Sequence, residues 1–144
     1  MIGSTQEERI MSDKASTHRP TVAVLGASRD RHKFGNQSVR AHVQYGYEVF
    51  PINPFADQIE GLRTYRSLAE LPVDTVDRVT VYVPSEIGLE LLEQIAAKQP
   101  REVWFNPGSE SEALLTRAAE LGLPVITACS IIGLAAETPK TKHN

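Results

Sequence analysis

TVAVLGASRDRHKFGN, residues 21–36, is the stretch on which the predicted fold depends. An unbroken apolar run, Val22–Leu25, leads through the turn 26–28 into a basic loop and then into a segment with helical spacing. A strand that is apolar on both faces is typical of a parallel sheet covered by helices on both sides. The turn after such a strand binds anions, because N–H groups at a helix start lack internal partners and carry partial positive charge. We interpret the loop as an anion site, since it gathers four basic residues around one acid: Arg29, Arg31, His32, Lys33 and Asp30.

Strands and helices alternate along the rest of the sequence. Apolar runs predict strands at residues 22–25, 48–52, 62–65, 78–83, 102–105 and 125–127. Apolar residues at three- and four-residue spacing predict helices at residues 36–45, 85–98 and 109–121, with a shorter one at 67–70. Ser85 is the expected N-cap of the helix at 85–98. Capping boxes are expected at two other helix starts, Ser67 with Glu70 and Ser109 with Glu112.

This alternation indicates a single α/β domain with a doubly wound, mainly parallel sheet of five to six strands and helices on both faces. The expected strand order is 3-2-1-4-5, with the short segment 62–65 at one edge and the last strand as a sixth at the other. Pro51 removes a ladder donor from the second strand, so we expect one edge of that strand to be only partly paired.

Length and charge limit the architecture and the partners. The 144 residues, 41% of them apolar, suit one domain, and we expect a poorly ordered lead-in at 1–19, the domain at 20–136 and a solvated tail at 137–144. A formal net charge of −3 argues against nucleic-acid and anionic-membrane partners, which normally need a basic face. No run approaches the roughly eighteen apolar residues that cross a bilayer, and the acidic N-terminal stretch does not resemble a secretory signal.

Cys129 is the single cysteine, which excludes an internal disulfide and a cysteine-cluster metal site. A chain without disulfides fits a reducing compartment, and we expect the protein to be cytoplasmic. The four histidines show no metal-ligand spacing, and the sequence contains no Ser-His-Asp set, zinc-protease motif or P-loop. We therefore predict no metal and no catalytic residues.

The carboxyl ends of the strands are the candidate binding rim, because ligands of open α/β sheets sit outside these ends. None of the residues there is a carboxylate. Such a rim can hold an anionic, partly apolar ligand but offers almost nothing for acid–base chemistry. It consists of five tripeptides: Gly26-Ala27-Ser28, Asn53-Pro54-Phe55, Val83-Pro84-Ser85, Asn106-Pro107-Gly108 and Thr127-Ala128-Cys129.

The class of nucleotide that the rim could bind is limited by two features that the sequence lacks. A dinucleotide fingerprint needs GxGxxG after the first strand and an acid after the second to bind the ribose hydroxyl. This sequence has Gly26 alone in the tight turn and Asn53 where the acid would stand, so NAD is disfavoured. NADP would fit only if the loop arginines bound its additional phosphate. Coenzyme A, with a diphosphate, a ribose phosphate and a long neutral arm, would use the same features.

An ordered set of motifs resembles the family of small stand-alone CoA-binding domains, which is similar to the N-terminal domain of the succinyl-CoA synthetase alpha subunit. The resemblance covers about residues 20–135 and implies a Rossmann-like, nucleotide-binding domain that binds CoA or an acyl-CoA. Thr127 and Ala128 stand where many relatives carry an acidic and a basic residue before the cysteine. The motifs are VAVLGAS (22–28), GYEVFPINP (46–54), EGL (60–62), DRVTVYVPSE (77–86), VWFNPGSES (103–111) and GLPVITAC (122–129).

The resemblance also implies positions for the ligand. Gly26, Ala27, Ser28 and Lys33 would meet phosphate, and among the loop cations Arg29 is the other candidate. Asn53, Pro54 and Phe55 would lie beside the adenosine, Val83 and Pro84 along the pantetheine, and Asn106, Pro107 and Gly108 would close the path. Asn53-Pro54 and Asn106-Pro107 are also ordinary turn dipeptides, so turn formation and ligand contact both stay open.

We therefore predict a non-catalytic CoA or acyl-CoA binding protein, because the synthetases' phosphorylated histidine loop lies in another domain. A redox response would follow if Cys129 formed a mixed disulfide with CoA, whereas a buried cysteine would act as a small apolar residue. An NAD(P)-binding sensor or oxidoreductase domain is the alternative, and an interaction domain with a vestigial site a weaker one. The apolar stretch 131–136 would either pack on the sheet or form a homodimer interface.

Overall fold

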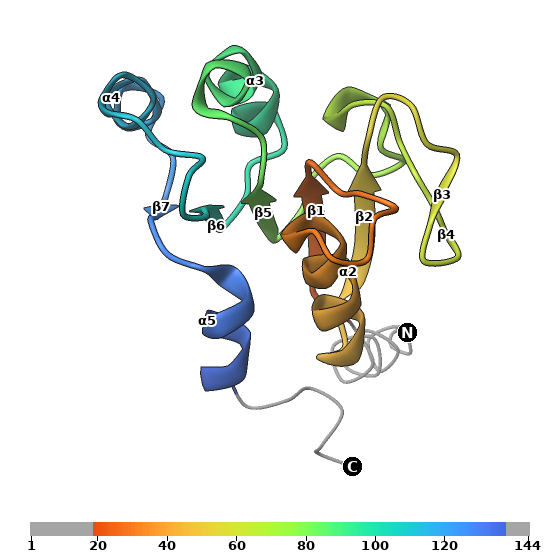
Figure 1. The fold of residues 1–144 in the computed structure, drawn as a ribbon. Helices are drawn as coiled ribbons and strands as arrows, with labels where there is room; N and C mark the ends of the chain where they lie inside the picture. The colour runs from red at the N-terminus through yellow and green to blue at the C-terminus, as the bar shows by residue number, and fades with distance from the viewer. Residues whose placement is uncertain (1–18, 138–144) are drawn as a thin grey trace, which may run out of the picture.

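The computed structural model describes residues 19–137. The expected lead-in at 1–19 and the expected tail at 137–144 lie outside the described residues, except for residues 19 and 137. A five-stranded sheet forms the centre, in the order β2-β1-β5-β6-β7, with every neighbouring pair parallel. Helices α3 and α4 cover one face, and α2 and α5 cover the other (Figure 1). The predicted Rossmann-like, doubly wound fold is confirmed.

The element bounds agree closely with the predicted segments. The strands are β1 Thr21–Leu25, β2 Glu48–Ile52, β3 Gln58–Ile59, β4 Leu62–Arg63, β5 Arg78–Val81, β6 Glu102–Phe105 and β7 Val125–Ile126. The helices are α2 Phe34–Gln44, α3 Ser85–Ala97, α4 Glu112–Glu120 and α5 Ser130–Ala136, and a short 3₁₀ helix, η1, spans Leu68–Glu70.

The edge beyond β2 differs from the prediction. Residues 62–65 do not form a third parallel strand, because β4 pairs antiparallel with β3 in a separate two-stranded ribbon. Only Tyr65 reaches β2, where its N–H donates to the Pro51 carbonyl and its carbonyl accepts from Asn53 N–H. The N and the carbonyl of one strand residue point to the same side, so the donor that Pro51 lacks would have faced this outer edge. The expected partly paired edge is confirmed.

Two predicted helix starts are shifted. Pro84 is the N-cap of α3, and Ser85 is its first residue rather than its cap. Helix α4 begins at Glu112 with Ser111 as its N-cap, whose hydroxyl accepts from Leu114 N–H at 3.2 Å. The predicted cap, Ser109, donates instead to the Asn106 carbonyl at 2.7 Å, because it belongs to the turn after β6. Ser67 precedes η1 as expected but makes no side-chain capping bond.

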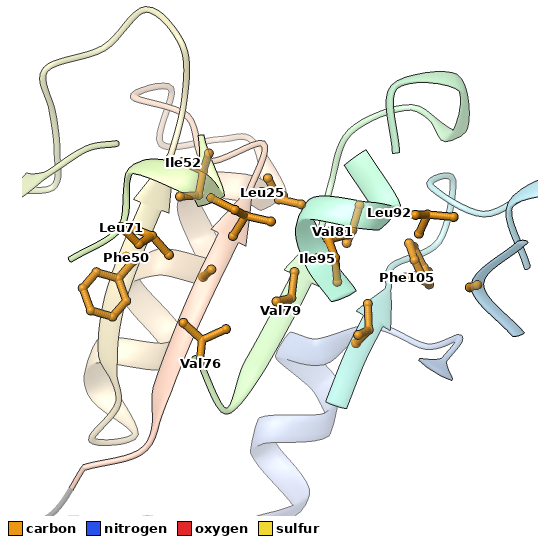
Figure 2. Close-up of a cluster of buried hydrophobic side chains, with 14 of the residues drawn as sticks. Leu25, Phe50, Ile52, Leu71, Val76, Val79, Val81, Leu92, Ile95 and Phe105 are labelled. Atoms are coloured by element: carbon orange, nitrogen blue, oxygen red, sulfur yellow. The ribbon is translucent and has the colours of Figure 1, made fainter. Parts of the chain in front are cut away.

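The two faces of the sheet bury different chemistry. Alternate strand residues point to opposite faces, and Val79, Val81 and Phe105 pack with α3 and α4 in an apolar core (Figure 2). On the α2–α5 side, β5 and β6 instead carry Arg78, Thr80 and Asn106, all of them buried. This polar inner face is possible because each group is hydrogen-bonded, which offsets the cost of removing it from water.

Arg78 fixes the end of α5 to the sheet. Its guanidinium, 4% exposed, lies 2.7 Å from Glu137 Oε2 and 2.9 Å from Glu102 Oε1. The same group lies 5.1 Å from the ring centroids of Tyr47 and Trp104. A buried charge needs partners of this kind, since a guanidinium left unpaired in the core would be strongly destabilising.

The apolar stretch 131–136 packs on the sheet as part of α5. Leu134 is fully buried, and Gly133 lies so close to Trp104 that an added Cβ would be 2.6 Å from the indole ring. Leu134 and Gly133 therefore pack within the molecule, whereas Ile132 is exposed, and the homodimer interface stays a prediction.

His42 is buried beside Arg78, and this burial predicts that the protein loses stability in mild acid. Its Nδ1–H donates to the Ser38 carbonyl at 2.9 Å, and Nε2 faces Arg78 Nη1 at 3.3 Å, so the ring is neutral. Burial lowers its pKa from 6.5 to about 4. As the pH falls, His42 is protonated in the unfolded chain before it is protonated in the folded one. Its contribution to the free energy of unfolding, up to roughly 3 kcal/mol, is therefore present above pH 6.5 and is lost as the pH falls toward 4.

We expect the unfolding free energy of His42→Gln, measured by urea denaturation from pH 7 to pH 4, to fall less steeply than that of wild type. The matched control is His32→Gln, because the His32 side chain is fully exposed. Equal slopes for wild type and His42→Gln would contradict the assignment.

Candidate functional site

A cleft of about 530 Å³ opens at the carboxyl ends of β1, β2, β5 and β6, the edge predicted to bind ligand. It brings together residues from the four loops that follow these strands and that are far apart in the sequence. We call it the main cleft, and it is lined by Gly26, Ala27, Ser28, Lys33, Phe34, Gly35, Asn53, Tyr82, Pro84, Pro107, Gly108 and Ser109. None of these is a carboxylate or a histidine, as predicted for the rim.

Two glycines shape the wall of this cleft. Gly26 has φ +88°, a conformation that side-chain-bearing residues rarely adopt. Gly35, in the first turn of α2, lies so close to it that an added Cβ would be 2.1 Å from the Gly26 carbonyl oxygen. The start of α2 therefore rests directly on the β1 turn, a role of Gly35 that the sequence pattern did not reveal.

The first turn of α2 presents free backbone donors. Within residues 19–137, the N–H groups of Phe34 and Gly35 donate to no protein acceptor, and the N-cap residue Lys33 makes no side-chain capping bond. Such groups at a helix start bind anions by hydrogen bonding and through the helix dipole. Phe34, Gly35 and Lys33 all line the main cleft, so these donors stand at its wall.

Two of the basic residues in the loop after β1 lie beside carboxylates, and two do not. Arg31 Nε lies 3.1 Å from Glu60 Oε2, and His32 Nδ1 lies 3.5 Å from Asp30 Oδ1. Arg29 and Lys33 are exposed and form no ion pair with any residue from 19 to 137. Lys33 lines the main cleft, whereas Arg29 lines neither that cleft nor the two cavities that adjoin it.

Short-range hydrogen bonds hold the loop in shape. The Asn36 amide donates to the Ser28 carbonyl at 2.9 Å and to Glu60 Oε2 at 3.0 Å. The Asn36 amide, followed by the charge of Arg31, lowers the pKa of the Glu60 carboxyl. The His32 N–H donates to Asp30 and holds the pKa of that carboxyl below its usual value. Sequence reasoning missed Glu60 because it comes from the β3–β4 ribbon.

The two rim asparagines use their side chains within the protein. Asn53 donates to the Ala27 carbonyl at 2.9 Å and accepts from the N–H groups of Phe55 and Ala56. Asn106 is 2% exposed, donates to Thr80 Oγ1 at 2.7 Å and accepts from Ser130 N–H at 2.8 Å. Both side chains therefore shape turns.

Two further cavities adjoin the main cleft. One, of about 270 Å³, shares Gly26 and Asn53 with it and is also lined by Pro54 and Val83. The other, of about 350 Å³, is lined by Phe34, Gln37, Tyr82, Asn106, Pro107, Cys129, Ile131 and Ile132. Phe55, 90% exposed, lines neither of them nor the main cleft.

Tyr82 is the main omission from the predicted site. It lines both the main cleft and the cavity at Cys129. The alternation of residues 78–83 could have revealed it, since a residue two positions after Thr80 points to the same face.

Metal and membrane features are absent from the described part of the chain. No group of three or more histidine, cysteine, aspartate or glutamate side chains in it could hold a metal ion. No helix between residues 19 and 137 is long and apolar enough to cross a membrane.

A family model described as "CoA binding domain" matches residues 20–135. The acetate–CoA ligase [ADP-forming] II of Archaeoglobus fulgidus is 39% identical over 80 residues, which are 54% of this chain and 12% of the ligase. The uncharacterized protein YneT of Bacillus subtilis is 28% identical over 73% of this chain and 77% of its own length. The chain spans no more than 20% of the ligases and the synthase that it matches.

Solved structures that resemble this chain include small proteins of similar size. A conserved hypothetical protein from Pyrococcus furiosus superposes with a TM-score of 0.70 at 34% identity. The match covers 80% of this chain and 98% of that one.

The contact between Gly35 and Gly26 predicts a large effect from one methyl group. We expect Gly35→Ala to lower the unfolding free energy by about 1–3 kcal/mol, because the added carbon meets backbone that cannot move aside cheaply. Gly88→Ala in α3 is the control, since its added carbon would meet only the flexible Leu114 side chain at 3.0 Å and should change stability by less than about 1 kcal/mol. Urea denaturation of the variants measures both, and equal stabilities would show that the α2 start does not depend on this contact.

Proposed function

The chain belongs to the CoA-binding domain family, and we propose that it binds coenzyme A or an acyl-CoA without catalysing a reaction itself. The observation that carries this proposal is the wall of the main cleft. Phe34 and Gly35, whose N–H groups donate to no acceptor within residues 19–137, line it together with Lys33, and no carboxylate is among the lining residues. A diphosphate bound there would be hydrogen-bonded by the backbone and neutralised by the lysine.

The row of cavities supports a long ligand. The cavity at Pro54 and Val83 shares Gly26 and Asn53 with the main cleft, and the cavity at Cys129 shares Phe34, Tyr82 and Pro107 with it. We propose that the adenosine lies at Asn53, Pro54 and Phe55, and that the pantetheine passes Val83 and Pro84 toward residues 106–108. Arg29 and Lys33 then take phosphate groups.

The lack of a carboxylate and a histidine in the lining of the main cleft supports a binding role. Among the residues that line it, Lys33 is the one charged side chain. Histidine and carboxylate side chains are the groups that general acid–base catalysis uses most often. We propose a regulatory carrier that acts in the cytoplasm, as expected of a chain with one cysteine.

A nicotinamide dinucleotide is the alternative ligand. Asn53 follows β2 at the position where a dinucleotide domain needs an acid, and its amide is bound to the Ala27 carbonyl. This argues against NAD. NADP keeps some support, because Arg29 and Lys33 have no ion-pair partner among residues 19–137 and could take a ribose phosphate.

Calorimetry with matched ligands tests the proposal. We expect CoA to bind about tenfold more tightly than dephospho-CoA, because the loop cations add charge-assisted hydrogen bonds to the ribose phosphate. Lys33→Gln and Arg29→Gln should reduce this preference, and Arg101→Gln, an exposed cation at the start of β6, should not. Equal binding of CoA and dephospho-CoA would rule out ribose-phosphate recognition, and tighter binding of NADP than of CoA would favour the alternative.

A redox response is the second role that we propose, through Cys129 beside the CoA thiol. Cys129 is partly exposed and lines the cavity of about 350 Å³. Two thiols would join in a disulfide, and an added oxidant such as diamide would take up the two electrons and two protons.

We expect intact-mass measurement after treatment with diamide and CoA to show one CoA attached, and the adduct to disappear with dithiothreitol. Cys129→Ser should bind CoA but form no adduct. No adduct on the wild-type protein would end the redox hypothesis and leave CoA binding unaffected.

A further inference from the structure

The cavity beside Cys129, which we call the acyl groove, has a different character from the main cleft. Its apolar walls come from Phe34, Ile131 and Ile132, and no charged side chain lines it. At about 350 Å³ it falls within the range of small-ligand pockets, roughly 300–1,000 Å³. Phe34 is 64% exposed and Ile132 is 71% exposed, so two large apolar side chains stand open at its mouth.

The polar side chains of the groove are already engaged. The Tyr82 hydroxyl lies 3.0 Å from Ser130 Oγ, and Gln37 donates to the His32 carbonyl at 2.9 Å. Asn106 donates to Thr80 and accepts from Ser130 N–H. A polar occupant would lose its hydrogen bonds to water and find few new ones here, whereas an apolar occupant would lose nothing and would cover exposed apolar surface.

The groove continues the main cleft. Phe34, Tyr82 and Pro107 line both, so a molecule held by its phosphates at the start of α2 can extend past Tyr82 into the groove. Free CoA ends in a small thiol and would leave the apolar walls uncovered. A thioester with an apolar acyl group matches the change from polar to apolar walls along this path.

We propose that the groove holds the acyl group of a bound thioester, and that the ligand is therefore a CoA ester of an apolar acid rather than free CoA or acetyl-CoA. This inference rests on the proposed binding of CoA to the main cleft. It adds the chemical class of the acyl group and assigns Ile132, which does not line the main cleft, as a residue that determines specificity.

Calorimetry with CoA, acetyl-CoA and hexanoyl-CoA tests the inference on the full chain. Burying additional methylene groups should make hexanoyl-CoA bind at least about tenfold more tightly than CoA, with acetyl-CoA close to CoA. Ile132→Gln should remove most of this preference. Leu89→Gln is the control, since Leu89 is a 39% exposed apolar residue of α3 that lines none of the three cavities, and should keep the full preference.

The outcomes separate the inference from the proposed function. If CoA and hexanoyl-CoA bind equally well, or if Ile132→Gln keeps the preference, the groove does not hold the acyl group, and the proposed binding of CoA is unaffected. If none of the three ligands binds, the proposed function fails and the inference fails with it. Sedimentation of the ligand-free protein is the second measurement, because a dimer that Ile132→Gln dissociates would assign the groove to a second copy of the chain and overturn the proposal.

Discussion

The start of α2 rests on the β1 turn because Gly35 carries no side chain, and much of the binding edge depends on that contact. At this helix start, the Phe34 and Gly35 N–H groups donate to no acceptor within residues 19–137, and both residues line the main cleft. The Asn36 amide then joins the turn to Glu60 of the β3–β4 ribbon, and Glu60 holds Arg31. The close contact between Gly35 and Gly26 thus brings the backbone donors of α2, Lys33 and the basic loop to the same edge of the sheet.

The polar face of the sheet connects this edge to α5. Asn106, at the end of β6, joins Thr80 of β5 to the N–H of Ser130, the first residue of α5. At the other end of the strands, Arg78 holds Glu137, which follows α5. The short helix is therefore fixed at both ends by buried polar bonds, and its first turn keeps Cys129 and Ile131 beside Tyr82. Buried polar groups satisfied in this way favour one arrangement over alternatives that would leave them unpaired.

Local sequence patterns revealed most of the fold, and interactions distant in sequence account for what they missed. The apolar runs and the spacing of Leu92 and Ile95 are properties of single segments, so the helices and the five strands of the sheet could be predicted. The predicted place of residues 62–65 in that sheet was wrong. Ser109 and Ser111 look equally suitable as caps, and only the Asn106 carbonyl, which takes the Ser109 hydroxyl, decides between them. The bond between Arg78 and Glu137 joins residues 59 positions apart, and no pattern within a segment announces it. The rim position of Gly26 followed from a strand end and the role of Lys33 from the basic loop and the family resemblance. Phe34 required the fold, whereas the alternation of residues 78–83 was enough to reveal Tyr82.

Both borders of the sheet are poor templates for adding a strand from another molecule. On one side Pro51 offers no N–H outward, and the backbone of Tyr65 already occupies the positions on either side of Ile52. On the other side β7 has only two residues, Val125 and Ile126, too few for a lasting ladder. Exposed sheet borders promote polymerisation when they are long and regular. The shape of both borders therefore hinders another molecule from extending this largely apolar parallel sheet.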